Sequence, residues 1–380
     1  MDSFSYFRVF KLPGMKLMPH HTSIAAAALL VVLTATMTTT SLAQVSSGED
    51  SQATGWRLSE TGTNVSLRGL SAVDDDVIWA SGAEATVIRS LDGGETWHSC
   101  GPDGYDDLEF RCVCAFSAND ACIASAGTPA VLLRTEDGGT SWKETYRAES
   151  DAAFFDAMQF WDAKRGQAVS DPVDGRLLVV ETNDGGLSWK KLSTELPLSR
   201  LGEAAFAASN SSLLLGEDGR LWFGTGGATS DTSRLYTRSG WNQPWVPVSV
   251  PMPSSQASGI FAVCRGPAIV GVDAAGPLFC VGGDYRASET SKVTACISLD
   301  DGKTWQRVTV QPESFRSDVM AIPEGSPLAR SLITVGPAGT DLSRDGTNWT
   351  SFSDVGFHAL SVGKRKVFAC GSEGRFARLD

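Results

Sequence analysis

The sequence predicts an all-β fold, a seven-bladed β-propeller built from four-stranded blades, and three observations support that prediction. A turn-like pattern ending in tryptophan recurs along the chain at intervals of roughly 45 residues, the length of one propeller blade. Short apolar or alternating segments lie between the copies, as expected of β-strands. No long segment of helical periodicity follows residue 43. These features favour radial repetition of small sheets.

The recurring pattern is Ser/Thr-x-Asp-Gly-Gly-x-Ser/Thr-Trp, and its residue types are those of a hairpin turn. The aspartate can accept backbone N–H bonds across the turn, and the glycines allow positive φ. The tryptophan then enters the next strand, where its ring can pack against a neighbouring sheet. The copies are Ser90–Trp97, Thr135–Trp142, Thr182–Trp189, Ser298–Trp305 and the shorter Ser343–Trp349, with a worn copy at Tyr236–Trp241.

We interpret the turn aspartates as structural rather than as calcium ligands. Each turn offers one carboxylate, except that Asp300 adds a second in one copy, whereas calcium takes a cluster of oxygen ligands. The aspartates expected to form the turns are Asp92, Asp137, Asp184, Asp301 and Asp345.

The number of blades follows from the tryptophans that begin the fourth strand. They are expected at Trp97, Trp142, Trp189, Trp241, Trp305 and Trp349. A seventh, Trp56, has no such turn before it, while the C-terminus supplies three strands without a fourth. We therefore predict that the segment from Trp56 completes the last blade, so that the two ends of the chain share one sheet and close the ring. The worn fourth unit and the long fifth unit leave six or eight blades as alternatives.

The N-terminus is predicted to be an export signal. A mildly basic stretch precedes an uncharged apolar run, 24–37, which is shorter than a typical membrane span and ends in Ser41-Leu42-Ala43. We expect a signal peptide over 1–43, a flexible leader over 44–55 and one propeller domain over 56–380. The protein would then be periplasmic or secreted, with no stable membrane span after cleavage. A retained anchor is the alternative, and Met15 or Met18 could be the true start.

Composition limits the chemistry. The chain has 380 residues, with Lys+Arg 32 against Asp+Glu 44, and its net charge of −12 argues against nucleic acid as a partner. The chain has only four histidines, which limits histidine-based metal sites. We expect no metal and no cofactor. Eight cysteines permit disulfides in an oxidising compartment, although several lie in apolar strand-like runs; their pairing stays open.

The recurring turn is similar to the Asp box, or BNR repeat, and the chain resembles the family of photosystem II stability/assembly factor-like propellers. The stretches that carry the resemblance are 154–162, 170–176, 202–209, 222–227, 281–286, 335–343 and 356–361. The resemblance implies a propeller that helps to assemble or stabilise another complex. Exported bacterial chains of this kind are often catalogued as oxidoreductases or glycosyl hydrolases, labels that rest on the repeat alone.

Propeller topology also predicts where a site would lie. The Asp-box turns join third and fourth strands, so they lie on the face opposite to the starts of the inner strands. One mouth of the central channel would therefore be ringed by charged side chains, a candidate site for a protein partner or a small polar or saccharide ligand. The ring is Arg68, Arg111, Asp156, Glu203, Arg316 and His358, with Asp171, Asp284 and Tyr285 on loops above it. The alternative is that these charges pair with one another and fill the channel.

An enzyme is the second functional hypothesis. The charged residues at this mouth resemble the active-site residues of a sialidase. In that comparison Arg68, Arg111 and Arg316 would bind the substrate carboxylate. The catalytic candidates would be Asp156, Glu203, Tyr285 and His358. The Arg-Ile-Pro motif of those enzymes is absent, and no Gly-x-Gly-x-x-Gly opens a helix as a nicotinamide enzyme would need. We therefore favour a non-enzymatic binding or scaffold protein over a glycoside hydrolase.

Overall fold

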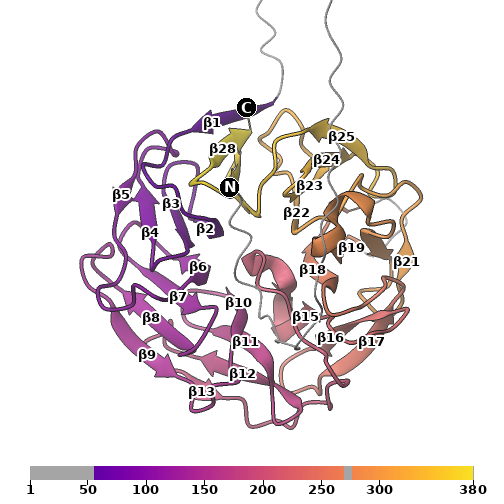
Figure 1. Ribbon diagram of the computed structural model, residues 1–380, viewed down its shortest axis with the longest axis horizontal. Coiled ribbons are helices and arrows are strands. Elements are labelled where there is room, and N and C mark those ends of the chain that lie inside the picture. Colours follow the sequence, from indigo (N-terminus) through magenta and orange to yellow (C-terminus); the bar gives the residue numbers. More distant parts are fainter. Residues whose placement is uncertain (1–54, 269–275, 380) are drawn as a thin grey trace, which may run out of the picture. The chain divides into compact units, whose positions relative to one another are not determined.

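The computed structural model describes residues 55–268 and 276–379, and within them the chain forms seven four-stranded antiparallel sheets arranged in a ring (Figure 1). The predicted signal peptide and nearly all of the predicted leader lie outside the described residues. Within the described ranges, no helix has the length and apolar character that crossing a membrane requires. The seven-bladed propeller predicted from the sequence is confirmed.

The first three blades follow the expected order, with the innermost strand first. Blade 1 holds β2 (Leu67–Ala72), β3 (Ile78–Gly82), β4 (Val87–Ser90) and β5 (His98–Ser99). Blade 2 holds β6 (Phe110–Ala115), β7 (Ala121–Ser125), β8 (Val131–Thr135) and β9 (Lys143–Arg147). Blade 3 holds β10 (Phe155–Phe160), β11 (Gly166–Val173), β12 (Arg176–Thr182) and β13 (Lys190–Lys191).

The next three blades have the same strand order and carry three short 3-10 helices. Blade 4 holds η1 (Asn210–Ser212), β14 (Leu213–Leu215), η2 (Glu217–Gly219), β15 (Arg220–Gly224), β16 (Ser233–Ser239) and β17 (Val246–Val250). Blade 5 holds β18 (Ser258–Arg265), β19 (Leu278–Asp284), η3 (Tyr285–Thr290), β20 (Ala295–Ser298) and β21 (Gln306–Arg307). Blade 6 holds β22 (Asp318–Ala321), β23 (Leu332–Gly336), β24 (Gly339–Ser343) and β25 (Thr350–Ser353).

Blade 7 closes the ring with strands from both ends of the chain. It holds β26 (Ala359–Val362), β27 (Val367–Cys370), β28 (Phe376–Leu379) and, from the N-terminal side, β1 (Trp56–Ser59). β1 runs antiparallel to β28, with Trp56 opposite Leu379, and the two strands lie side by side in Figure 1. The Trp56 ring packs 5.0 Å from that of Phe357, which anchors the closure in apolar contact. The predicted sharing of one blade by the two chain ends is confirmed.

The tryptophan that precedes each fourth strand packs between its own blade and the one before it. Trp189, for example, contacts the core of blades 2 and 3 and lies 5.7 Å from the Phe160 ring. In blade 4 this position belongs to Trp245, which is 3% exposed, and not to Trp241, which is 38% exposed. The expectation for Trp241 was wrong because the worn turn of blade 4 extends further before its last strand begins at Val246.

Four of the Asp-box turns share one hydrogen-bond pattern, and the shorter turn at Asp345 varies it. In the first, the Ser90 hydroxyl donates to Asp92 (2.8 Å), and Asp92 accepts from the backbone amide (2.9 Å) and hydroxyl (2.5 Å) of Thr96. In the fourth copy Asp300 takes this role, accepting from the Thr304 amide at 2.8 Å. The expectation that Asp301 forms that turn was off by one residue, because the second aspartate replaces the first glycine of the pattern.

Asp301 instead joins two blades. It adopts a positive φ of 61° and pairs with Arg220 of blade 4 (3.2 Å) and Arg265 of blade 5 (2.6 Å). All eight cysteines lie in the described residues and are free thiols in this structure.

The two faces of the ring are distinct. Gly93 of the first Asp-box turn donates to the carbonyl of Asp76, and Gly185 donates to that of Lys164, so these turns lie beside the loops that join first and second strands. We call this side the box face. The inner strands begin on the other side, the mouth face, as the topology predicts.

Candidate functional site

β-Bulges set the ring of side chains at the mouth. Near the start of β6, Phe110 pairs with Ser125 and Cys112 pairs with Ala124, which leaves Arg111 as an extra residue. A bulge of this kind re-aims the side chain of the extra residue and is often found beside functional sites. The same irregularity occurs near the start of three other inner strands, and the extra residues of the four strands are Arg68, Arg111, Asp156 and Phe261.

Blades 6 and 7 place Ser317 and His358 at the equivalent position. The Ser317 amide bonds the Val335 carbonyl although Asp318 already pairs with Val335. His358 bonds the Cys370 carbonyl in the same way, beside the pair formed by Ala359 and Cys370. The position in blade 6 therefore belongs to Ser317 and not to Arg316.

Arg316 is consequently directed into its own blade. Its Nε donates to Asp341 of β24 at 2.6 Å, and both side chains are 1% exposed. Because successive residues of a strand point to opposite sides, a difference of one position separates Arg316 from the side chains of the ring. The structure thus does not bring Arg316 together with Arg68 and Arg111.

Arg68 and Arg111 are joined by a residue that the sequence analysis did not select. Glu109 accepts from Arg111 Nη2 at 2.6 Å and lies 3.6 Å from Arg68 Nε. Burial and the charge of Arg111 lower the pKa of Arg68 to about 10, with Glu109 acting in the opposite direction. The position of Glu109, immediately before the inner strand that carries Arg111, is the only sequence signal for it.

Asp156 is a buried carboxyl group without a hydrogen bond of ordinary geometry. The residue is 0% exposed, and neither carboxyl oxygen has a hydrogen-bond partner in the described part of the chain. Burial and the neighbouring charge of Asp171 raise its pKa well above the usual value, against the opposing effect of Arg111. Asp171 itself accepts from the Ala205 amide at 2.9 Å. The burial of Asp156 therefore favours its neutral form.

His358 lies on the cationic side of the mouth and is also neutral. It is 8% exposed, and its Nε2 lies 2.9 Å from the Ser372 hydroxyl. Burial, followed by the charges of Arg68 and Arg111, lowers its pKa well below the usual value. His358 can exchange hydrogen bonds here but adds no positive charge at neutral pH.

Glu203 is engaged inside blade 4. It accepts from the hydroxyl of Thr225 (2.7 Å) and forms an ion pair with Arg234 (2.7 Å), and its side chain is 2% exposed. The Tyr236 hydroxyl also donates to it at 3.3 Å. These bonds hold the Glu203 carboxylate as a structural group of the blade.

The remaining two candidates lie above blade 5. Asp284 caps η3 by accepting from the Arg286 amide at 2.9 Å. The Tyr285 ring lies 6.3 Å from each of Phe206 and Phe261, which stack on each other at 4.2 Å. The mouth is therefore two-sided, with arginines over blades 1 and 2 and aromatic rings over blades 4 and 5.

A segment of blade 4 fills the channel beneath the mouth. The sequence predicts the inner strand of this blade near Gly202, but β14 begins only at Leu213, and residues 204–212 run along the channel instead. We call this segment the plug; its 3-10 turn η1 contacts β2, β6, β10 and β18, and its coil lies near the centre of the ring in Figure 1. The inner strand expected at Gly202 was wrong because a run of small residues lies here in irregular structure.

Polar contacts fix the plug to several blades. Asn210 accepts from the Met158 amide (2.8 Å) and donates to the Val113 carbonyl (3.3 Å). Arg111 Nη1 donates to the Ala207 carbonyl at 3.2 Å, so one of the two mouth arginines also holds the plug. Below it, burial raises the pKa of Asp318 to about 7, although the carboxylate accepts from the Leu360 amide at 2.8 Å. The bonds of Asn210 and Arg111 hold the plug against blades 2 and 3.

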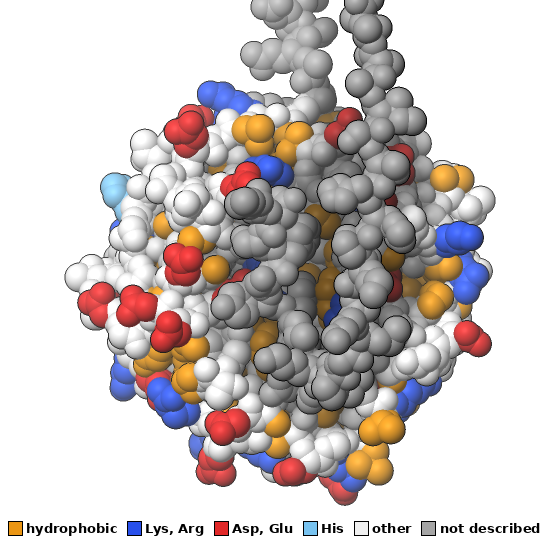
Figure 2. Space-filling model, viewed as in Figure 1, with side chains coloured by type: hydrophobic (Ala, Val, Ile, Leu, Met, Phe, Trp, Pro, Cys, Tyr) orange, Lys and Arg blue, Asp and Glu red, His pale blue; other side chains and the backbone are white. Residues whose placement is uncertain are grey.

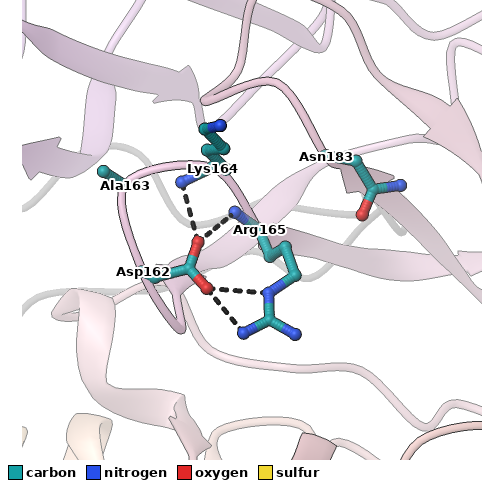
Figure 3. A pocket seen from close by; sticks show the side chains of 5 residues that line it. All are labelled: Asp162, Ala163, Lys164, Arg165 and Asn183. Carbon is teal, nitrogen blue, oxygen red and sulfur yellow. Dashed lines mark hydrogen bonds and ion pairs between the residues drawn. The ribbon is translucent and has the colours of Figure 1, made fainter.

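Hollows elsewhere on the surface offer fewer side chains that could bind a ligand. One, of about 480 Å³, lies on the box face and is lined by Asp162, Ala163, Lys164, Arg165 and Asn183. Figure 3 shows the Asp162 carboxylate turned toward the Arg165 guanidinium and the two adjacent backbone amides, so this carboxylate is satisfied within its own loop. Figure 2 shows side chains of both charge signs interspersed around the outer part of the face it draws. In the described part of the chain, no three His, Cys, Asp or Glu side chains are grouped to hold a metal ion.

The fold defines the class of this protein as a seven-bladed β-propeller, with charged side chains at one mouth of its channel. A family model described as "Photosynthesis system II assembly factor YCF48" matches residues 49–149. The resemblance to photosystem II assembly factor-like propellers is therefore confirmed. A search of curated proteins found no match.

Solved structures share the fold over most of the chain. A structure titled "YCF48 bound to D1 peptide" is 17% identical, covers 85% of this chain and 96% of its own, and has a TM-score of 0.61. "YCF48 from Cyanidioschyzon merolae" is 18% identical, with coverages of 86% and 99% and a TM-score of 0.59. The WD40 propeller domain of Doa1 is 14% identical, with coverages of 86% and 97% and a TM-score of 0.52. At these identities the likeness shows the fold alone.

Proposed function

We propose that this protein is a non-enzymatic binding propeller that holds a segment of a protein partner at its channel mouth and so assists the assembly or stability of a complex. The observation that carries the proposal is the pair of arginines, Arg68 and Arg111, which bulges in two neighbouring blades direct to one opening. The likeness to a YCF48 structure whose title names a bound D1 peptide supports a peptide-like ligand.

The chemistry of the mouth fits recognition better than catalysis. Glu203, one of two carboxyl groups that a glycosidase would need, is held by hydrogen bonds within blade 4. Arginine is the side chain best suited to bind carboxylates of a partner at an interface. Export to the periplasm or beyond is part of the proposal, and N-terminal sequencing of the mature chain, expected to begin at Gln44, tests it.

The test is capture of a partner by the full chain from the envelope fraction of its own host, with captured proteins identified by mass spectrometry and rebound in purified form. The double variant Arg68→Gln/Arg111→Gln should lose at least about tenfold in partner recovery, as expected when charge-assisted bonds at an interface centre are removed. Arg330→Gln/Arg344→Gln, which removes two exposed charges from the box side of blade 6, is the matched control.

Circular dichroism melting of both variants separates loss of binding from loss of fold, because Arg111 is 4% exposed and also contacts the plug. A folded double variant that recovers the partner as well as the wild type does would contradict the proposed function.

A further inference from the structure

Two arginines and one glutamate lie together at the mouth, an arrangement that Asp301 repeats on the box face between Arg220 and Arg265. Arg68 comes from β2 and Arg111 from β6, while Glu109 lies just ahead of β6. One carboxylate oxygen of Glu109 faces Arg111 (2.6 Å), and the other faces Arg68 (3.6 Å). Glu109 thus bridges the two guanidinium groups as a ligand carboxylate would.

We propose that Arg68 and Arg111 form a carboxylate-binding site and that Glu109 is its internal occupant, which the carboxylate of a ligand replaces. This inference rests on the proposed function, because it names the chemical class that the same mouth recognises: an acidic segment of a partner.

The two arginines need a carboxylate between them. Each is largely removed from water, and the charge of Arg111 lowers the pKa of Arg68, so the two cations repel each other in this position. Like charges at short range in a partly buried site are destabilising unless an opposite charge compensates them. Glu109 supplies that charge in the free protein, and an incoming carboxylate can supply it equally well.

Glu109 is placed so that its side chain can leave without a change of fold. Its backbone carbonyl accepts from the Ala126 amide at 2.8 Å, which fixes the main chain independently of the carboxylate. The side chain is 16% exposed and that of Arg68 is 17% exposed, so both reach solvent at the mouth. Arg111 is held from behind by the Ala207 carbonyl and keeps its place when Glu109 moves.

The pair formed by Arg316 and Asp341 shows the contrast. Both partners are 1% exposed, and no solvent path leads an external carboxylate to that arginine. A buried pair of this type is a structural element, whereas the bridge at Glu109 is open on one side. This exposure, together with the position of the bridge at the mouth, assigns an exchangeable role to Glu109.

The experiment measures binding of a fluorescein-labelled oligoglutamate peptide to the full chain by fluorescence anisotropy, with oligoglutamine as the uncharged probe. Glu109→Gln should bind oligoglutamate about tenfold more tightly than the wild type, because the internal competitor is gone while the arginines stay. Glu324→Gln, which removes the same charge from an exposed pair with Arg330 on the box face, should leave the affinity unchanged.

A second measurement uses the wild type alone and so does not depend on how the variant folds. An arginine-specific dicarbonyl reagent, followed by peptide mass spectrometry, should modify Arg68 more slowly in the presence of oligoglutamate than in the presence of oligoglutamine. Equal rates, or Glu109→Gln binding no more tightly than the wild type, would overturn the proposal for Glu109. Capture of a partner that still depends on Arg68 and Arg111 would leave the proposed function standing in that case.

Discussion

Asp92 of the first Asp-box turn and Asp156 at the channel mouth lie on opposite faces of one ring and are in opposite electrostatic states. The Thr96 hydroxyl, followed by the Thr96 amide, lowers the pKa of Asp92 to about 2. At the mouth, burial raises the pKa of Asp156 well above its usual value. Asp92 is exposed, charged and satisfied by near neighbours in sequence, whereas Asp156 is buried among groups that are distant in sequence.

This difference separates the carboxyl groups that stabilise the fold from those that belong to the candidate site. Five turns repeat the bond from a Ser or Thr hydroxyl to the turn aspartate. The mouth has no such repetition: its groups come from different blades, and Asp156 lacks a hydrogen-bond partner in the described residues. Uncompensated buried polarity is a cost to stability, and such costs concentrate at functional sites.

The largest effect is expected at Arg316, which lies one residue away from the ring of mouth side chains. Arg316→Met leaves Asp341 buried without its partner, which typically costs about 3–5 kcal/mol of unfolding free energy. Urea denaturation of the full chain measures the loss. Because Arg316 faces into blade 6, the folded variant should bind oligoglutamate as the wild type does; a selective loss of binding without loss of stability would place Arg316 in the site.

A smaller effect, of opposite sign, is expected at Asp156. Its folded pKa lies above that of the unfolded chain, so the folded protein keeps a proton that the unfolded chain releases, and stability falls as pH rises from about 4 toward the folded pKa. Asp156→Asn has no proton to lose. Its stability relative to the wild type should therefore increase with pH, by up to about 1.4 kcal/mol per pH unit in that range.

Thermal melts of the two proteins between pH 4.5 and about 8 measure this trend, with Asp92→Asn as the matched change on the box face. The pKa of Asp92 is lowered in the folded state, so its contribution is fully present above about pH 4 and is lost only as the pH falls toward 2. Asp92→Asn should therefore melt lower than the wild type by a constant amount. Parallel curves for Asp156→Asn and the wild type would refute the neutral, buried state of Asp156.

Because the blades repeat, much of the fold could be predicted from the sequence. The spacing of the turns and the unpaired Trp56 sufficed for the number of blades and for the closure by β1 and β28. Where one turn departs from the repeated pattern, the predicted residue was wrong. Asp300 and Asp301 differ by one place in the turn pattern, and Trp245 replaces Trp241 where blade 4 lengthens its turn.

The candidate site could be predicted only in part from the sequence, because β-bulges and long-range contacts leave no periodic pattern in it. Alternation of apolar and polar residues located Arg68, Arg111 and Asp156 at the inner strand starts, where the structure places them. It could not distinguish Ser317 from Arg316, since a single extra residue changes which side chain faces the channel. The sequence pattern did not predict Glu109 or the plug, because their roles depend on contacts between blades.

Site-specific photo-crosslinking in the producing cell tests most directly whether the mouth, rather than the box face, is the working surface. A benzophenone amino acid would replace Leu201, fully exposed in the loop before the plug, or Leu187, 42% exposed in an Asp-box turn. The account predicts a partner crosslinked through position 201 and none through position 187. A partner crosslinked through position 187 alone would contradict it.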